Sequence, residues 1–129
     1  MRTLIPMTIL MVACASPSTG VPLEQDFELQ PGQSASIAGT GQTVTFEGVS
    51  EDSRCPTGVV CVWAGNARVN LRVGAAGRDT SVALNTGIEP HAVQVGNLKL
   101  MLKAVTPEPQ AGVKTPAEAY GITLRATGT

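Results

Sequence analysis

The sequence predicts an antiparallel β-sandwich, and three observations support this. From residue 26 onward, apolar residues recur mainly in short runs with a period of two, as in strands that bury one face. Glycine, proline and asparagine separate these runs, and no long helical period is visible. The chain has 129 residues, including 14 glycines and 9 prolines, which is enough for one domain with one core. These features favour an immunoglobulin-like or related Greek-key sandwich of about seven to nine short strands.

The first expected strands lie before residue 50. Residues 27–30 are followed by a Pro-Gly turn, and residues 34–38 are followed by a Gly-Thr-Gly turn. In the run 42–49, Val44 and Phe46 lie on one side and threonines lie on the other. We therefore expect residues 42–49 to form a strand with one buried face and one solvent-exposed face.

The second half of the chain continues the pattern. Residues 66–73 alternate most clearly, with apolar residues on one face and arginine or asparagine on the other, and a Gly-Ala-Ala-Gly hairpin follows. In the run 98–105, three leucines and Ala104 form the expected apolar face. The capping-box pattern at residues 115–118 predicts one helical turn. The remaining expected strands cover residues 78–84, 92–95 and 120–126.

The N-terminal segment has the pattern of an export signal. A charged start is followed by an apolar run that is too short to span a bilayer and then by small residues. Residues 11–14, Met-Val-Ala-Cys, resemble the lipobox of bacterial lipoproteins, with methionine where that family prefers leucine. The resemblance implies cleavage before Cys14 and lipidation of Cys14. Cleavage after Ala15 by the other signal peptidase is the alternative.

This interpretation divides the chain into three parts. Residues 1–13 are the signal peptide, residues 14–24 are a lipidated tether, and residues 25–129 are the sandwich domain. We expect an exported protein of the bacterial periplasm, anchored to a membrane by the lipid on Cys14. The outer membrane is favoured over the inner one.

Two further cysteines, Cys55 and Cys61, follow the signal. In an exported chain, an even number of cysteines at close spacing most simply forms a disulfide. Pro56 and Gly58 supply the turn between them. We expect Cys61 to open a strand that runs through Trp63, with the following Ala-Gly pair as a bulge.

The two large aromatic residues of this region each allow two interpretations. Trp63 is expected to pack over the disulfide or the end of the core, and a platform that faces a ligand is the alternative. Tyr120 starts the last expected strand. There it forms either a tyrosine corner or ordinary edge packing.

The residues Asp52-Ser53-Arg54 favour a structural network over catalysis. Neighbouring side chains point apart, and a nucleophilic serine would need a base that only His91 could supply. We expect Asp52 to bind the backbone or Arg54. Two thiols and one histidine are too few ligands for a metal site, so no metal or cofactor is predicted. A net charge of −1 without basic clusters argues against nucleic acid as a partner.

Residues 52–67, DSRCPTGVVCVWAGNA, resemble a motif, roughly DSRCPxxxxCxWAGxA, of small exported bacterial proteins. These proteins are mostly uncharacterised, and many are lipoproteins. The resemblance covers most of the mature chain in layout and is specific at residues 52–67. It implies a cell-envelope module with the Cys55–Cys61 bridge and Trp63 as hallmark residues, and it implies no activity.

A more distant resemblance is to chagasin-like inhibitors of cysteine peptidases. Residues 56–58, Pro-Thr-Gly, and Trp63 are similar to the Pro-Thr-Thr-Gly loop and the tryptophan of that family. One threonine is missing here, the spacing differs, and two cysteines intervene.

The leading functional expectation is a lipid-tethered sandwich whose loops bind a protein partner or scaffold the envelope, without catalysis. One alternative is a chagasin-like peptidase inhibitor that acts through residues 55–63, and another is a hydrolase that uses His91. The candidate residues of the loop are Asp52, Arg54, Pro56, Thr57, Gly58 and Trp63.

Overall fold

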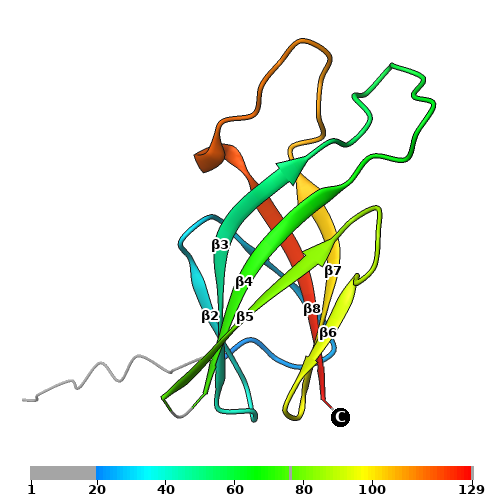
Figure 1. The fold of residues 1–129 in the computed structure, drawn as a ribbon. Helices are drawn as coiled ribbons and strands as arrows, with labels where there is room; N and C mark the ends of the chain where they lie inside the picture. The colour runs from blue at the N-terminus through cyan, green and yellow to red at the C-terminus, as the bar shows by residue number, and fades with distance from the viewer. Residues whose placement is uncertain (1–19, 76, 129) are drawn as a thin grey trace, which may run out of the picture.

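The structure is a computed structural model that describes residues 20–75 and 77–128. Its elements are β1 (Gln25–Leu29), β2 (Ser34–Ile37), β3 (Gln42–Asp52), β4 (Ala67–Ala75), β5 (Arg78–Asn85), β6 (Ala92–Val95), β7 (Leu98–Thr106), the short 3₁₀ helix η1 (Ala117–Ala119) and β8 (Gly121–Gly128). The strands form two antiparallel four-stranded sheets (Figure 1). The predicted β-sandwich is therefore confirmed. Cys14 and the expected signal peptide lie outside the described residues.

The two sheets differ in strand order. One sheet has the order β2-β3-β4-β5, which is a simple meander. The other has the order β1-β8-β7-β6, in which three consecutive strands are joined by β1 from the start of the chain. The first strand of the chain therefore pairs with the last strand in this sheet.

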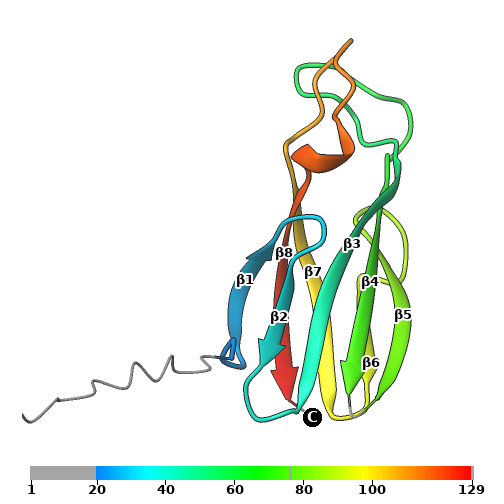
Figure 2. The same ribbon diagram turned by 90° about the vertical axis from the view of Figure 1, so that its left-hand side faces the viewer.

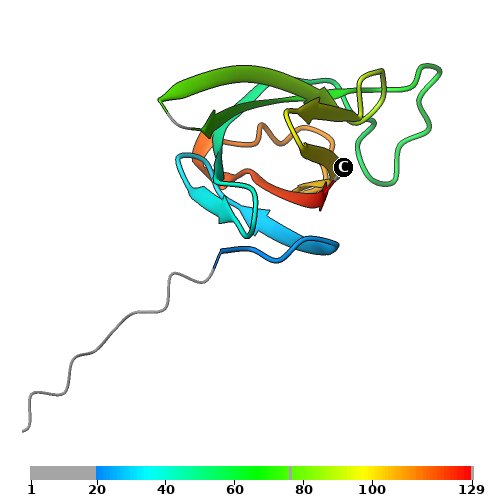
Figure 3. The same ribbon diagram turned by 90° about the horizontal axis from the view of Figure 1, so that it is seen from below.

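Figure 3 shows the two sheets facing each other in a view roughly along the strands, and the buried side chains of both sheets form one core cluster. Val44 and Phe46 of β3 are fully buried, as the alternation predicted. They lie in a cluster with residues from β4, β5, β7 and β8. Burial of such side chains contributes about 1.5–3 kcal/mol each. The largest fully buried side chains are Phe46, Leu71, Leu84, Leu98, Leu100, Ile122, Leu124, Val44, Val69 and Val73.

The structure corrects the expected apolar face of β7. Leu98, Leu100 and Leu102 are buried as predicted, but Ala104 is exposed and Val105 is buried in its place. The register between β7 and β8 shifts between Leu102 and Ala104. A β-bulge adds one residue to the strand, so the residues beyond it change faces.

The predicted helical turn is present but differs in its start. Pro116 is the N-cap of η1, and no side chain caps the helix by a hydrogen bond. The capping box predicted at residues 115–118 is therefore wrong. The proline at the N-cap has no side-chain oxygen that could accept a bond from a backbone N–H.

The described chain begins at one end of the sandwich. Val21 donates its backbone N–H to the Ser36 oxygen, and Glu24 donates to the Ala126 oxygen. Residues 21–24, which the sequence assigned to the tether, thus lie against the sheets. The long loops lie at the opposite end (Figure 2). Within residues 20–75 and 77–128, no helix is long and apolar enough to cross a membrane.

Candidate functional site

Three loops gather at the end of the sandwich farthest from Val21. They are the β3–β4 loop (residues 53–66), the β5–β6 loop (residues 86–91) and the β7–β8 loop (residues 107–120). Figures 1 and 2 show the β3–β4 and β7–β8 loops projecting beyond the strands. All of the candidate residues that the sequence singled out between 52 and 63, and Tyr120, lie at this end. We call it the loop end.

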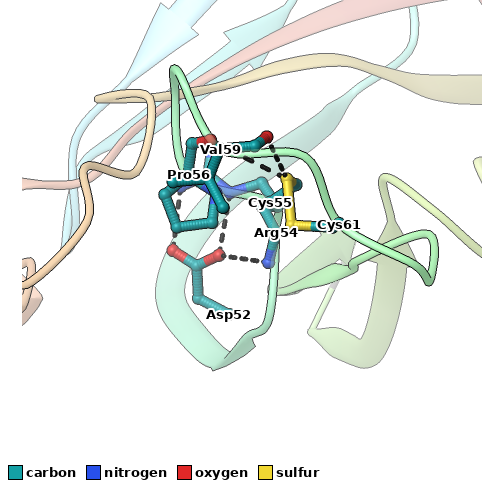
Figure 4. The surroundings of a disulfide bond; sticks show 6 residues. All are labelled: Asp52, Arg54, Cys55, Pro56, Val59 and Cys61. Carbon is teal, nitrogen blue, oxygen red and sulfur yellow. Dashed lines mark hydrogen bonds and ion pairs between the residues drawn. A yellow bond between two sulfur atoms is a disulfide. The ribbon is translucent and has the colours of Figure 1, made fainter.

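The base of the β3–β4 loop is held by an ion pair between Asp52 and Arg54. Arg54 Nε donates to Asp52 Oδ1 and Nη2 donates to Oδ2, both at 2.8 Å (Figure 4). The two side chains are only 14% and 13% exposed, respectively. Two parallel bonds between a guanidinium and a carboxylate fix the geometry as well as the charge. The predicted Asp52–Arg54 network is therefore present.

Tyr120 completes this arrangement. Its side chain is buried, and its hydroxyl donates to Asp52 Oδ2 at 2.8 Å. A tyrosine corner binds the backbone a few residues upstream, whereas this bond reaches a side chain 68 residues away. Tyr120 is therefore no corner; it joins the start of β8 to the end of β3. We call Asp52, Arg54 and Tyr120 the clamp.

The clamp shifts the proton affinities of its members. The hydrogen bonds from Arg54 lower the pKa of Asp52, and the Tyr120 hydroxyl adds to this effect against the opposing effect of burial. Hydrogen bonding to Asp52 raises the pKa of Arg54. Burial, followed by the bond to Asp52, raises the pKa of Tyr120. At neutral pH the clamp therefore holds a carboxylate, a guanidinium and a neutral phenol.

The same arginine attaches the β3–β4 loop to the β7–β8 segment. Arg54 Nη1 donates to the Val105 oxygen at 2.8 Å, and Nη2 donates to the Pro107 oxygen at 3.0 Å. Farther along, the Thr57 backbone N–H donates to the Pro109 oxygen at 2.8 Å. Polar bonds thus join the two loops.

The disulfide closes the next part of the loop. Cys55 and Cys61 are bonded, as predicted, with their Cα atoms 5.9 Å apart (Figure 4). Gly58, between them, has a positive φ of 80°, which favours glycine. A disulfide across a loop of this length stabilises by about 2 kcal/mol on chain-entropy arguments.

The end of the β3–β4 loop returns to the sandwich through close backbone packing. A Cβ added to Gly65 would lie 2.1 Å from the Ser53 oxygen, and one added to Gly87 would lie 2.0 Å from the Gly65 oxygen. The Asn66 side chain donates to Asn85 Oδ1 and accepts from the Gly87 backbone N–H. Gly65 is therefore needed for close approach and does not form the bulge that the sequence predicted.

Two expectations about the middle of the loop are wrong. No strand begins at Cys61; β4 starts at Ala67, and the chain bends at Val62 and Trp63. Trp63 was predicted to pack over the disulfide or the end of the core, and it does not belong to the core, because the residue is 65% exposed. The physical reason is that the loop stands beyond the sheets, where no apolar layer remains to cover it. The alternative interpretation, an exposed platform, is compatible with this position.

We call residues 59–64 the tip. Val60 is 96% exposed and Val62 is 92% exposed. With Val59 and Trp63, the projecting loop carries four exposed apolar side chains. The sequence signal that could have revealed this surface is the uncharged run from Cys55 to Asn66, which carries no Asp, Glu, Lys or Arg.

The residues considered for catalysis are engaged elsewhere. The Ser53 hydroxyl donates to the Asn66 oxygen and accepts from the Asn66 N–H. His91 Nδ1 lies 2.8 Å from the Asn85 oxygen, and its Nε2 lies 3.5 Å from Glu89. Across the described residues, no hydrogen bond joins His91 to Ser53 or Asp52, and no group of three or more His, Cys, Asp or Glu could hold a metal ion.

A groove of about 690 Å³ separates the β3–β4 loop from the β7–β8 loop. Asp52, Arg54 and Tyr120 contribute to its wall. Both carboxylate oxygens of Asp52 already accept two hydrogen bonds each within the chain. The clamp therefore offers this groove few free polar atoms, and the tip is the stronger candidate for contact with a partner.

Comparison of the chain with known protein families, with curated proteins and with solved structures finds no match.

Proposed function

We propose that this chain is a lipid-anchored module of the bacterial cell envelope that binds a protein partner, or scaffolds one, through its loop end. The observation that carries the proposal is the exposed tip: Val60, Val62 and Trp63 project from a loop that a disulfide and the clamp hold in place. Exposed apolar groups rimmed by polar residues are typical of interaction sites.

The anchoring part of the proposal rests on the N-terminal pattern. Cys14 follows small residues, and an oxidising compartment is consistent with the Cys55–Cys61 disulfide. The described chain starts at the end of the sandwich opposite the loop end (Figure 2). An anchor attached there leaves the tip directed away from the anchored end.

Mass spectrometry of the mature N-terminus tests the anchor. We expect a chain that begins at a modified Cys14, with a mass increased by its acyl groups, and we expect Cys14→Ser to leave the membrane fraction. An unmodified chain that begins at Ser16 would contradict lipidation. That result would leave the binding role intact.

Cross-linking in intact cells tests the binding role. We expect one defined adduct that disappears in Trp63→Ala and persists in Met101→Ala, because Met101 is an exposed apolar residue on β7, outside the loop end. Comparison of the two variants distinguishes an effect specific to the tip from the effect of removing any exposed apolar side chain. An adduct that persists in both variants would contradict the role of the tip.

Peptidase inhibition is a second candidate function. It is favoured by the position of residues 57–63 on an exposed loop at the end of a β-sandwich, with Trp63 in solvent. Inhibition of a papain-like peptidase that Trp63→Ala abolishes would support this candidate. No inhibition at micromolar concentration would remove it.

A further inference from the structure

We propose that the tip, residues 59–64, seats in a cleft of a partner protein that offers both an apolar pocket and hydrogen-bonding groups, through a contact that carries no charge. This inference rests on the proposed binding role and specifies the chemistry of the partner. It excludes a lipid bilayer as the surface that receives the tip.

The side chains of the tip define the apolar half of the contact. Val60 and Val62 are almost fully exposed, and Trp63 exposes most of its ring. The loop that carries these side chains projects beyond both sheets, so a partner can surround them (Figure 1). Projecting apolar side chains can fill a pocket, and aromatic anchors in pockets dominate many protein interfaces.

The main chain of the tip defines the polar half. Within residues 20–75 and 77–128, the backbone groups of residues 60–64 make no hydrogen bonds, and the Trp63 indole N–H has no acceptor. Water satisfies these groups when the tip is free. Their transfer into hydrocarbon would leave them unpaired, which costs free energy for every group. A protein cleft can pair them, so a protein is the more favourable partner.

The charge distribution sets a second condition. The run from Cys55 to Asn66 has no charged side chain. The nearest charge before it belongs to Arg54, whose guanidinium binds Asp52 and two backbone oxygens. The tip itself therefore offers no charge to lipid headgroups or to a salt bridge with a partner. The carboxylate of Glu108 lies beside the base of the same loop, where it accepts a hydrogen bond from the Thr57 hydroxyl. Binding should therefore depend little on ionic strength.

The base of the loop makes such a contact favourable. The disulfide, the clamp and the bond from Thr57 to Pro109 fix the loop before any partner arrives. A loop that is already ordered loses less conformational entropy on binding. The tip is therefore presented by a preorganised support.

Trp63 fluorescence gives a direct test with lipid, because Trp63 is the chain's only tryptophan. The mature chain carrying Cys14→Ser, which has no acyl groups of its own to insert in a bilayer, is titrated with vesicles of phosphatidylcholine alone and of phosphatidylcholine mixed with phosphatidylglycerol. We expect no blue shift of the emission and no co-sedimentation with either vesicle. A blue shift with vesicles would assign the tip to the bilayer and overturn the inference, while a binding role for the loop end would stand.

A photo-crosslinker supplies the positive arm. A photoreactive amino acid is placed at position 62 or, as the control, at position 101, and intact cells are irradiated. We expect one adduct from position 62 only. The partner identified in the adduct is then purified in its free form and titrated into the wild-type chain. Binding should shift the Trp63 emission to shorter wavelength. The Kd for this binding should change less than about twofold when the salt concentration rises tenfold.

Substitution of the tip completes the test. Val62→Asp should weaken binding of the purified partner by at least about 100-fold, because it buries an unpaired carboxylate, whereas Met101→Asp should bind like the wild type. Both changes are at exposed positions, so neither should destabilise the fold. An unfolding midpoint close to that of the wild type checks that each variant is folded. Equal binding by the two variants, an adduct of twice the chain's mass, or a strongly salt-dependent Kd would overturn the inference. The absence of any adduct and of any vesicle binding would overturn the proposed function as well.

Discussion

The base and the tip of the β3–β4 loop are only a few residues apart, yet they differ in almost every physical property. At the base, every polar atom of the Asp52 carboxylate and most donors of Arg54 are paired at 2.8–3.3 Å. At the tip, the main chain of residues 60–64 is unpaired within the described chain, and the side chains of Val60, Val62 and Trp63 are exposed. At the base, the paired hydrogen-bonding groups stabilise the fold. At the tip, the backbone groups that have no partner within the described chain are available to a binding partner.

This comparison also explains why a loop so far from the core can be ordered. The loop end contributes few buried apolar side chains, so its order must come from polar bonds and one covalent link. Arg54 reaches the backbone on both sides of the cis Thr106–Pro107 peptide, and Thr57 binds Pro109. Changes at the base should therefore alter stability, and changes at the tip should alter binding alone.

The largest effect is expected for Arg54→Met. The change removes the two side-chain bonds to Asp52 and the bonds to two backbone oxygens, and it leaves a largely buried carboxylate without its cation. We expect the free energy of unfolding to fall by about 3 kcal/mol, measured by urea denaturation. The control is Arg72→Met, which breaks the exposed pair with Glu47 and should cost less than about 1 kcal/mol. Equal losses in the two variants would refute the special role of the clamp.

Removal of the disulfide should have the next largest effect. The double variant Cys55→Ser/Cys61→Ser is expected to lose about 2 kcal/mol of stability and to remain a folded sandwich, because the bond lies outside the core. Urea denaturation gives the stability, and far-UV circular dichroism gives the fold. Loss of all β-structure in this variant would show that the loop organises the sheets, contrary to our account.

The pH dependence of stability measures the contribution of the Asp52 carboxylate. Arg54 holds the pKa of Asp52 below its ordinary value, so Asp52 stabilises the fold above its unfolded pKa. That stabilisation is lost as the pH falls through the lower, folded-state pKa. Between about pH 5 and about pH 2, the wild type should therefore lose more stability than Asp52→Asn, which cannot titrate. Parallel curves for the two proteins would contradict the coupling.

A single hydrogen bond should give a smaller change. Tyr120→Phe keeps the buried ring and removes only the bond to Asp52 Oδ2. The expected loss is about 1 kcal/mol, measured in the same denaturation experiment. A neutral effect would place Tyr120 in simple packing and outside the clamp.

The smallest effect on stability is expected at the tip. Trp63→Ala removes a mostly exposed ring and should change the free energy of unfolding by less than about 0.5 kcal/mol. The same variant should lose binding in the cross-linking experiment. A large loss of stability would mean that the ring packs against the protein in solution, as the sequence first indicated.

The sequence predicted the parts of the molecule that local rules control. Alternation located the strands that bury Phe46 and Leu71, and the close spacing of Cys55 and Cys61 in an exported chain predicted the disulfide. The pairing of Asp52 with Arg54 followed from the reach of neighbouring side chains. Each of these features depends on residues that are near one another in the chain.

The parts that the sequence missed depend on distant partners. Tyr120 meets Asp52 across 68 residues, and no pattern near either residue indicates this. The bulge in β7 that exposes Ala104 depends on the register with β8. Trp63 was predicted to pack over the disulfide or the end of the core, and its exposure follows from the position of the loop beyond the end of the sheets.

Amide hydrogen exchange measured by NMR, residue by residue, tests the contrast between base and tip most directly. The backbone N–H groups of Ser53 and Thr57, which donate to Asn66 and Pro109, should exchange at least about 100-fold more slowly than those of residues 60–64. Such a difference in exchange rate within one loop would support an ordered base that presents a tip without backbone hydrogen bonds. Uniform protection, or uniform rapid exchange, along residues 53–64 would contradict it.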